Sequence, residues 1–424
     1  MFPGVSVYRS RPSTALFLLM FLAGIVALVA VAAGIGTVNQ HHTPAPVTSA
    51  APRTPAPLAP TTLTVAMTGD ILSHGWVTAA SREADGQYHL EKLLAEVKPY
   101  LERADLALCH QEIPYGKPGQ APHGYPIFNA PMDWANGLVQ VGYDGCSTAS
   151  NHSWDQGTAG ITHTLEVLQN AGLGTAGTRA NAEQTPWQMY EIHKGGRTVH
   201  VAHLSFTYGL NFESVPEVDR HPYLVEINDV EQIIEYARQA RQAGADIVIV
   251  SPHGGSEYVY EPQPQQRQWA QALAQSGVVD AYVGHHAHFP QRITLTPGGV
   301  HGAGMWTYFG TGNLLTSQTP DMGIGTQIES IAWLSFDISG PEKNPQVTLS
   351  QAAWVPVVLD RSRFHAVPVH DFDGGATPPG SRLDAATVQR YHEELVKVMG
   401  NEATELKSPP PVPAEPAAVT VLAR

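Results

Sequence analysis

The chain has 424 residues, of which 43% are hydrophobic and 15% are charged, and its formal net charge is −14. This length allows one large domain or two medium ones, and the hydrophobic content is ordinary for a protein with a buried core. An acidic surface repels phosphates, and no run rich in Lys and Arg offsets it, which argues against nucleic-acid binding. An anionic polymer would also need a local cation in order to bind, and a metal ion can supply one.

The N-terminal part of the chain is typical of a membrane anchor. Residues 15–38 are uncharged and long enough to span a hydrocarbon core of ~30 Å as a helix. Arg9 and Arg11 precede this segment, so the positive-inside rule predicts that residues 1–14 are cytoplasmic and that the rest is exported. A cleaved signal peptide is the alternative, but the apolar stretch exceeds the usual length of such a segment. We therefore expect a single-pass cell-membrane protein.

Three further regions follow the predicted anchor. Residues 39–61 are rich in Pro and Ala, which predicts a semi-rigid linker. Residues 62–360 carry the periodic patterns of the main, extracytoplasmic domain. Residues 361–424 are a C-terminal extension with a predicted helix near 383–399, and a Pro-rich tail from Ser408 that resembles the linker.

Within the main domain, short apolar runs alternate with amphipathic ones. In chain order, we predict a strand at 63–68, a helix at 90–101, strands at 105–109 and 143–149, helices at 158–171 and 228–243, a strand at 246–251, a helix at 264–276 and a strand at 279–283. This alternation predicts an α/β fold with a mostly parallel sheet. A hairpin at 187–204 and further strands near 305–309, 328–337 and 346–354 indicate that the sheet is mixed.

The chain has two cysteines, Cys109 and Cys146. Two thiols in an exported protein can form a disulfide. Each of these lies in an apolar run that reads as a central strand, however, and free cysteine is among the most buried residue types. We therefore favour two buried free thiols.

Polar side chains follow five of the predicted strands where each strand ends. They are Asp70; His110 and Glu112; Asn151, His152 and Asp155; His253; and the run Gly284-His285-His286-Ala287-His288. In open α/β sheets the ligand site lies at the carboxyl ends of the strands, so we expect these residues to lie together. Carboxylate, amide oxygen and imidazole together suit Mn, Fe or Zn. Two such ions can clamp both the attacking and the leaving oxygens of a displacement.

The residue types suggest a role for each member of the set. We assign Glu112 as a bridging carboxylate, with the other metal ligands being Asp70, Asn151, His253, His286 and His288. His152 directly follows Asn151, so the two side chains should diverge, and we assign His152 as the proton donor to the leaving group. Each motif alone has a structural interpretation, such as a turn, a helix cap or a satisfied core histidine. Three histidines in four residues rarely serve packing.

Other candidates carry less weight. We expect that His301, His365 and His370 lack a matching carboxylate neighbour, and surface loops explain them. The chain has neither a Gly-x-Ser-x-Gly nucleophile elbow nor a familiar Gly-rich phosphate loop.

At these same positions the chain resembles the CapA family, which is associated with poly-γ-glutamate capsule synthesis. The resemblance covers roughly residues 62–320, in the ordered motifs TVAMTGDI, DLALCHQE, GYDGCSTASNHSWDQG, IVIVSPHGGSEY, VGHHAHFPQ and TYFGTGNLL. That family is similar to the calcineurin-like metallophosphoesterases, so the resemblance implies a four-layer αββα sandwich with one or two divalent ions. It implies the same ligand set, with His152 as the acid, and draws attention to Asp155 and Glu257 as further catalytic positions.

The sequence departs from this pattern in places. Metallophosphoesterases usually open with Asp-x-His, but Leu72 stands where that histidine belongs, so one metal position lacks a ligand or His74 replaces it. His285 adds a third histidine, and the spacing of the family favours His286 and His288.

Two functions follow from these observations. The first is a metal-dependent hydrolase or transferase that acts on an anionic surface polymer or its precursor, alongside other capsule-synthesis membrane proteins. The alternative is a non-catalytic scaffold for polymer binding or export, which the missing histidine of Asp-x-His mildly favours.

Overall fold

The computed structural model describes residues 58–342 and 344–424. The predicted anchor at 15–38, the cytoplasmic segment before it and nearly all of the linker lie outside the described residues. Within the described ranges, every helix is too short or too polar to cross a membrane.

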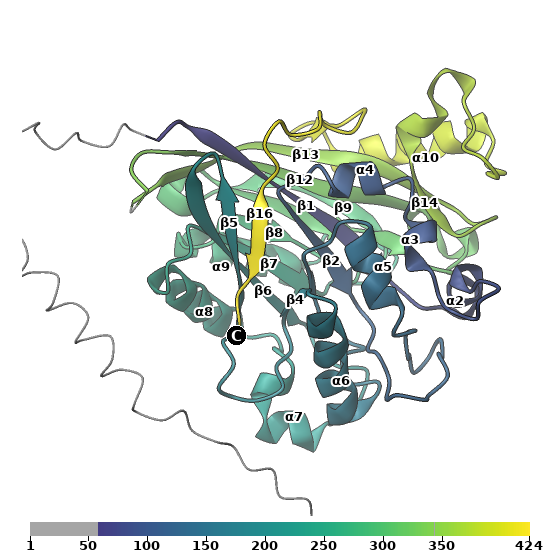
Figure 1. Cartoon of the computed structure of the whole chain (residues 1–424), viewed down its shortest axis with the longest axis horizontal. Coiled ribbons are helices and arrows are strands. Elements are labelled where there is room, and N and C mark those ends of the chain that lie inside the picture. Colours follow the sequence, from purple (N-terminus) through teal and green to yellow (C-terminus); the bar gives the residue numbers. More distant parts are fainter. Residues whose placement is uncertain (1–57, 343) are drawn as a thin grey trace, which may run out of the picture. The chain divides into compact units, whose positions relative to one another are not determined.

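Two mixed sheets form the described part of the chain (Figure 1). The first has the order β14-β13-β12-β1-β2-β3-β4, with β11 beside β1 and β15 beside β13. Its strands are β1 (Thr61–Ile71), β2 (Leu106–Gln111), β3 (Gly145–Ser147), β4 (Gly174–Ala176), β11 (Asn313–Leu315), β12 (Ile328–Ser339), β13 (Gln346–Asp360), β14 (His365–Pro368) and β15 (Thr404–Glu405). Strands β1 to β4 are parallel and β12 to β14 antiparallel, so the mixed α/β fold is confirmed.

The second sheet has the order β16-β5-β6-β7-β8-β10-β9. Its strands are β5 (Gln188–Lys194), β6 (Arg197–Thr207), β7 (Ile247–His253), β8 (Ala281–Val283), β9 (Pro290–Thr296), β10 (Met305–Thr311) and β16 (Ala418–Val421). The described α-helices are α2 (Gly75–Ser81), α3 (Leu90–Leu93), α4 (Lys98–Leu101), α5 (Trp134–Gln140), α6 (Gly157–Asn170), α7 (Pro216–Arg220), α8 (Val230–Gln242), α9 (Pro264–Ser276) and α10 (Ala385–Met399).

Side-chain alternation along the strands explains how the layers pack. In β2, Leu106 and Leu108 face a core shared with the second sheet, whereas Ala107 and Cys109 face a core with α3, α4 and α5. In β7, Ile247 and Ile249 join the core between the sheets, while Val248 and Val250 pack against α8 and α9. Successive residues of a strand point to opposite faces, so a continuous apolar run buries both faces.

Two predicted segments differ from the structure. The single helix expected at 90–101 is two short helices, α3 and α4, because Pro99 lacks the N–H that a continuous helix would need. The C-terminal tail is not wholly linker-like, because β16 pairs antiparallel with β5. Val419, Thr420 and Val421 are β-branched and suit an added edge strand.

The prediction of free thiols was wrong, because Cys109 and Cys146 form a disulfide. The two residues are direct partners in the parallel β2–β3 pair, and their Cα atoms lie 4.4 Å apart. Two cysteines at this separation are close enough to bond. Because the sequence alone did not show that these strands are neighbours in register, the pairing was not evident from it.

Candidate metal centre

The predicted strand ends converge at one place, and both sheets contribute to it. From the first sheet come Asp70 at the end of β1, Glu112 directly after β2, and the turn 150–156 after β3. From the second sheet come His253 at the end of β7 and the loop 284–289 after β8. His253 and His285 form an isolated bridge that holds the two segments of the second sheet together.

A glycine fixes the position of Asp70. A Cβ atom added to Gly69 would lie 2.1 Å from the carbonyl oxygen of Gly312, so only glycine fits there. Asp70 N–H donates to the same oxygen at 2.9 Å, and Gly69 N–H donates to the carboxylate of Glu329 at 2.7 Å. The close approach of two backbones therefore determines where the Asp70 carboxylate points.

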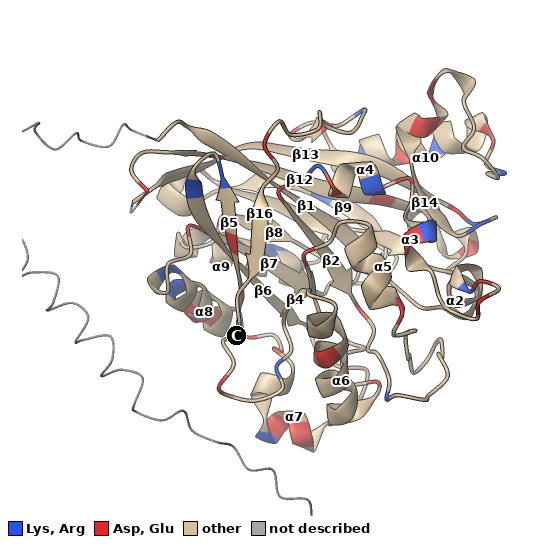
Figure 2. Cartoon of the chain, viewed as in Figure 1, with Lys and Arg blue, Asp and Glu red and all other residues tan. Residues whose placement is uncertain are grey.

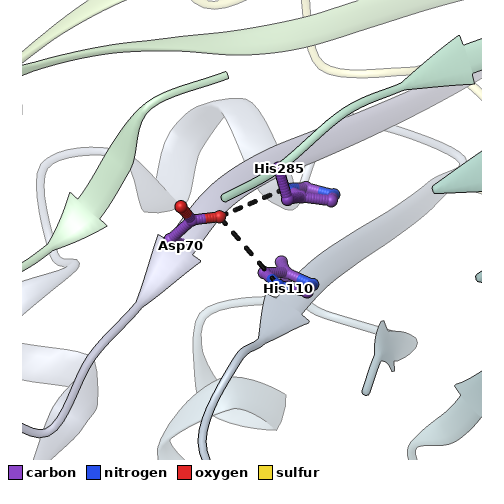
Figure 3. A group of neighbouring side chains, drawn as sticks. All are labelled: Asp70, His110 and His285. Carbon is purple, nitrogen blue, oxygen red and sulfur yellow. Dashed lines mark ion pairs between the residues drawn. The ribbon is translucent and has the colours of Figure 1, made fainter. Parts of the chain in front are cut away.

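The Asp70 carboxylate lies between three histidines. Its Oδ1 is 3.4 Å from Nδ1 of His285 and 4.0 Å from Nε2 of His110, as Figure 3 shows. Its Oδ2 is 3.1 Å from Nδ1 of His288. Burial acts to raise the pKa of Asp70, but the hydrogen bonds from His285 and His288 outweigh burial and hold that pKa well below its usual value.

Glu112 is the clearest indication of an ion at this site. Its side chain is buried, and among the described residues neither carboxylate oxygen has a hydrogen-bond partner. Burial, with Asp70 and Glu257 nearby, raises the pKa of Glu112 well above its usual value. The closest ionic neighbour is Nε2 of His288, 3.9 Å from Oε1. Burial of a charged carboxylate without a partner lowers the free energy of unfolding by roughly several kcal/mol, and a bound cation removes that cost.

The histidines of the loop after β8 have strained backbones. His286 has φ +87° and His288 has φ +53°, a region that residues other than glycine rarely adopt. Such conformations cost roughly 1–3 kcal/mol each and concentrate at functional sites. Burial and the nearby His288 lower the pKa of His286 to about 3, so its ring is neutral and able to bind metal. Among the described residues its Nδ1 has no hydrogen-bond partner.

His288 behaves differently because carboxylates surround it. Burial acts to lower its pKa, but the charges of Glu112 and Asp70 raise the pKa to about 9. In the absence of an ion, His288 is therefore the positive charge that offsets these carboxylates. An ion bound there would take over that role.

A chain of side-chain contacts that includes the predicted ligands Asn151 and His253 joins the two sheets. Oδ1 of Asn151 lies 2.7 Å from Nε2 of His253, and Nδ1 of His253 lies 2.9 Å from Nε2 of His110. Nδ1 of His110 is 2.7 Å from the hydroxyl of Ser147. Burial lowers the pKa of His253 and of His110 well below the usual value, so both rings are neutral.

His152 and Asp155 lie beside these ligands. Nδ1 of His152 is 2.8 Å from Oδ2 of Asp155, and the same carboxylate oxygen accepts from the backbone N–H of Phe128 at 2.7 Å. The Phe128 ring packs edge-on against His152, with ring centroids 4.7 Å apart. These contacts fix the orientation of the imidazole ring.

A cleft of about 660 Å³ opens onto the site. His152, Asn151, Glu257 and His288 line it, and Tyr125 at its wall is 73% exposed. None of the described residues that line the cleft is Lys or Arg. Figure 2 shows Lys and Arg scattered over several elements of the viewed face. The carboxylates and imidazoles of the site are therefore the ionisable groups that determine the electrostatic potential in the cleft.

The six predicted metal ligands, together with Glu257, fall into three groups. One is Asp70, Glu112 and His288, a second is Glu257, His286 and His288, and Asn151 with His253 forms the pair beside them. Glu257 is exposed, unlike the other members.

The structure also shows which residues lie around the position of the missing histidine. Leu72 is part of the hydrophobic core, and His74 belongs to none of the metal-ligating groups found among the described residues. His110 and His285 instead form a group with Asp70. Sequence reasoning assigned no role to His110, although its place at the end of β2 was a usable signal.

Asn211 was also missed. It follows β6 in a loop, and its Oδ1 accepts from Nδ2 of Asn151 at 3.0 Å. Its Nδ2 is 3.3 Å from both ring nitrogens of His152. No motif in the sequence marks this position.

Comparisons with known proteins identify relatives of the chain among proteins of capsule synthesis. The chain is 26% identical over 358 residues to the capsule biosynthesis protein CapA of Bacillus anthracis, which covers 80% of each chain. It is 26% identical over 181 residues to the PGA biosynthesis protein CapA of Bacillus subtilis, covering 43% of this chain and 44% of that protein. A probable polyglutamine synthesis accessory protein of Mycobacterium tuberculosis is 29% identical over 158 residues, 36% of this chain and 41% of that protein.

Solved structures also show similarity. A calcineurin-like phosphoesterase from Bacillus subtilis matches with a TM-score of 0.41 at 13% identity, over 80% of this chain and 99% of that one. The NAD nucleotidase of Haemophilus influenzae matches with a TM-score of 0.41 at 12% identity, over 79% of this chain and 60% of that one. The family model described as bacterial capsule synthesis protein PGA_cap matches residues 64–318. The chain therefore belongs to the PGA_cap family of bacterial capsule synthesis proteins.

Proposed function

We propose that this protein is a metal-dependent hydrolase or transferase that acts on an anionic surface polymer of the poly-γ-glutamate type, or on its precursor. The observation that carries the proposal is the buried Glu112 carboxylate, whose two oxygens are unpaired among the described residues and lie beside Asp70 and His288. The proposal includes a metallophosphoesterase-like four-layer αββα arrangement over residues 62–360.

The ligand types fit one or two divalent ions such as Mn, Fe or Zn. Asp70, Glu112, Asn151, His253, His286 and His288 supply carboxylate, amide and imidazole atoms, with His110 and His285 as further candidates. Such an ion would polarise a carbonyl or phosphoryl oxygen and lower the pKa of a water molecule. It would also attract a polyanion into a cleft whose described lining has no Lys or Arg.

The protein side chains perform the proton transfer. Hydrolysis adds the hydroxyl of water to the carbonyl carbon or phosphorus and breaks its bond to the leaving nitrogen or oxygen. His152 lines the cleft, and its Nδ1 is held by Asp155, so Nε2 is the atom that delivers a proton to the leaving group. Asp155 holds the ring in the required orientation. Glu257 lines the same cleft, next to His286 and His288.

The first test is the metal content of the purified full chain by elemental analysis. We expect one or two equivalents in the wild type, and a loss of at least one in Asp70→Asn and Glu112→Gln. The matched control is Glu329→Gln, because Glu329 is equally buried next to Asp70 but accepts a hydrogen bond from Gly69 N–H. That variant should retain the metal.

The second test is turnover. Metal-loaded protein is assayed on poly-γ-glutamate and on a generic phosphodiester, with His152→Gln as the inactive reference. Release of amine from the polymer supports amide chemistry, and release of alcohol from the phosphodiester supports phosphoester chemistry. A wild type without stoichiometric metal, or with metal but no turnover beyond His152→Gln, would favour the polymer-binding or export scaffold.

We also propose a single-pass anchor at residues 15–38 that places the main domain outside the cell membrane, where partner capsule-synthesis membrane proteins and the polymer would be encountered. The uncharged segment and the preceding Arg9 and Arg11 support this topology. Protease added to intact cells should degrade the main domain, and alkaline extraction should leave the full chain in the membrane fraction. A soluble chain of reduced mass would instead indicate cleavage.

A further inference from the structure

A second cluster of metal-ligating side chains lies in the C-terminal extension. His370 belongs to the 3₁₀ helix η6 (Val369–Gly375), His392 to α10 and Glu405 to β15. Nε2 of His370 is 2.7 Å from Oε1 of Glu405, and Nε2 of His392 is 2.8 Å from that same oxygen. The expectation that His370 lacks a carboxylate neighbour was therefore wrong. The same expectation for His365 was wrong too, because its Nδ1 lies 3.0 Å from Oε2 of Glu96.

Both ring nitrogens of His370 face carboxylates. Nδ1 lies 2.8 Å from Oδ2 of Asp373, while Nε2 faces Glu405. A neutral imidazole has a single N–H, so one of these contacts would set a nitrogen lone pair against a carboxylate oxygen. A proton or a cation has to lie between them. His392 approaches the same oxygen of Glu405 as His370 does, so both histidines need a proton or a cation next to that one oxygen.

The donor set and its surroundings match a zinc site. Two imidazoles and one carboxylate are a familiar zinc-binding set, with ligand distances of about 2.0–2.2 Å. Tetrahedral coordination at those distances separates the ligand atoms by about 3.3 Å, so they would have to move apart by about half an ångström. His392 is 27% exposed and Glu405 17%, which leaves room for that movement. The Asp373 carboxylate on Nδ1 of His370 is the outer partner that metal-bound histidines usually have.

We propose that His370, His392 and Glu405 bind one Zn²⁺ ion, with a water molecule in the fourth position. The ion would join η6, α10 and β15, three segments that are separate in sequence. Because Glu405 pairs with Trp354 of β13, the ion would fix α10 to the first sheet. These residues lie outside the family match at 64–318, so the site is independent of the metal centre and of the proposed function.

The test compares zinc content among variants of the full chain. Each protein is equilibrated with Zn²⁺ alone, and bound zinc is measured by elemental analysis. We expect His392→Ala and Glu405→Gln each to bind one equivalent less than the wild type. The matched control is His89→Ala, because His89 is 26% exposed and contacts two carboxylates, Asp85 and Glu91, but belongs to none of the clusters found in the described ranges.

A second comparison separates this site from the metal centre. In a Glu112→Gln background, the addition of Glu405→Gln should still remove one equivalent of zinc, even if the main centre holds none. Zn²⁺ should raise the thermal midpoint of Glu112→Gln by more than that of the double variant. Glu405→Gln keeps the size of the side chain, so it serves if His392→Ala does not fold. Equal zinc contents with and without Glu405 would overturn the proposal and identify the cluster as an ion-paired contact.

Discussion

His152 and Asp155 are joined by a hydrogen bond of 2.8 Å between Nδ1 and Oδ2, both side chains are buried, and His152 lines the cleft. The pair has the arrangement expected of a general acid and its orienting carboxylate, and it lies next to Asn151, a proposed metal ligand. Under the proposed function, proton transfer and metal binding are therefore assigned to different side chains of one turn of the chain.

That separation predicts the behaviour of His152→Gln. The variant should lose about 10²–10⁴-fold in kcat, because general acid catalysis contributes roughly that much. Its metal content should equal that of the wild type. Asp155→Asn should lose less activity, since it disturbs only the orientation of the ring. Elemental analysis beside the turnover assay checks both variants, and metal loss in His152→Gln would contradict the assigned role.

Gly69→Ala should disrupt the centre without touching a ligand. The new Cβ would meet the Gly312 carbonyl oxygen at 2.1 Å, so the backbone on one side has to move. We expect a loss of at least about 1–3 kcal/mol in the free energy of unfolding, typical of overpacking, together with a lower metal content. Gly75→Ala is the control, because nothing lies within 4 Å of its added Cβ. Guanidinium unfolding of Gly69→Ala and Gly75→Ala measures the difference in their free energies of unfolding.

Removal of the Cys109–Cys146 disulfide should destabilise the protein. The bond closes a loop with a sequence separation of 37, for which loop entropy predicts about 3–4 kcal/mol of stabilisation. The double variant Cys109→Ala with Cys146→Ala should therefore unfold at a lower guanidinium concentration than the oxidised wild type. The reduced wild type should shift in the same direction. Coincident unfolding curves for all three proteins would contradict this prediction.

Asp144→Asn should change how stability depends on pH. Burial raises the pKa of Asp144 to about 6, from an ordinary value of 3.8, although its carboxylate accepts a hydrogen bond from Ala107 N–H at 2.8 Å. The folded state therefore holds this proton more tightly than the unfolded state. Asp144 therefore contributes most to the free energy of unfolding below its pKa in the unfolded state. This contribution is lost as the pH rises through its pKa in the folded state.

The size of this effect is about 3 kcal/mol at most, since each unit of pKa corresponds to about 1.4 kcal/mol. Asparagine keeps the acceptor oxygen and cannot ionise. Relative to the wild type, the variant should therefore gain stability between about pH 4 and about pH 7.5. Unfolding free energies at these two pH values check the prediction. A constant difference between the two proteins would show that Asp144 does not titrate in this range.

The sequence was most informative where the chain is most regular. Apolar runs predicted the strands, and because parallel strands end at the same edge, the residues after them converge. The convergence of Asp70, Glu112 and His253 could therefore be predicted without knowledge of which strands are neighbours.

Features that depend on pairing between distant segments could not be predicted. The Cys109–Cys146 bond requires that β2 and β3 are adjacent and in register. Asn211 reaches His152 from a loop after β6, and no periodicity indicates where a loop folds back. His370 and Glu405 are 35 positions apart, so nothing local relates them.

The division of the ligands between the two sheets has a consequence for folding. Asp70, Glu112 and Asn151 lie at or after strand ends of the first sheet, and His253, His286 and His288 lie at or after strand ends of the second. A folding intermediate with only one sheet formed would offer a partial ligand set and would bind an ion weakly. An ion bound by the proposed ligands would therefore favour the native packing of the sheets over every such intermediate, and its dissociation would be coupled to the separation of the sheets.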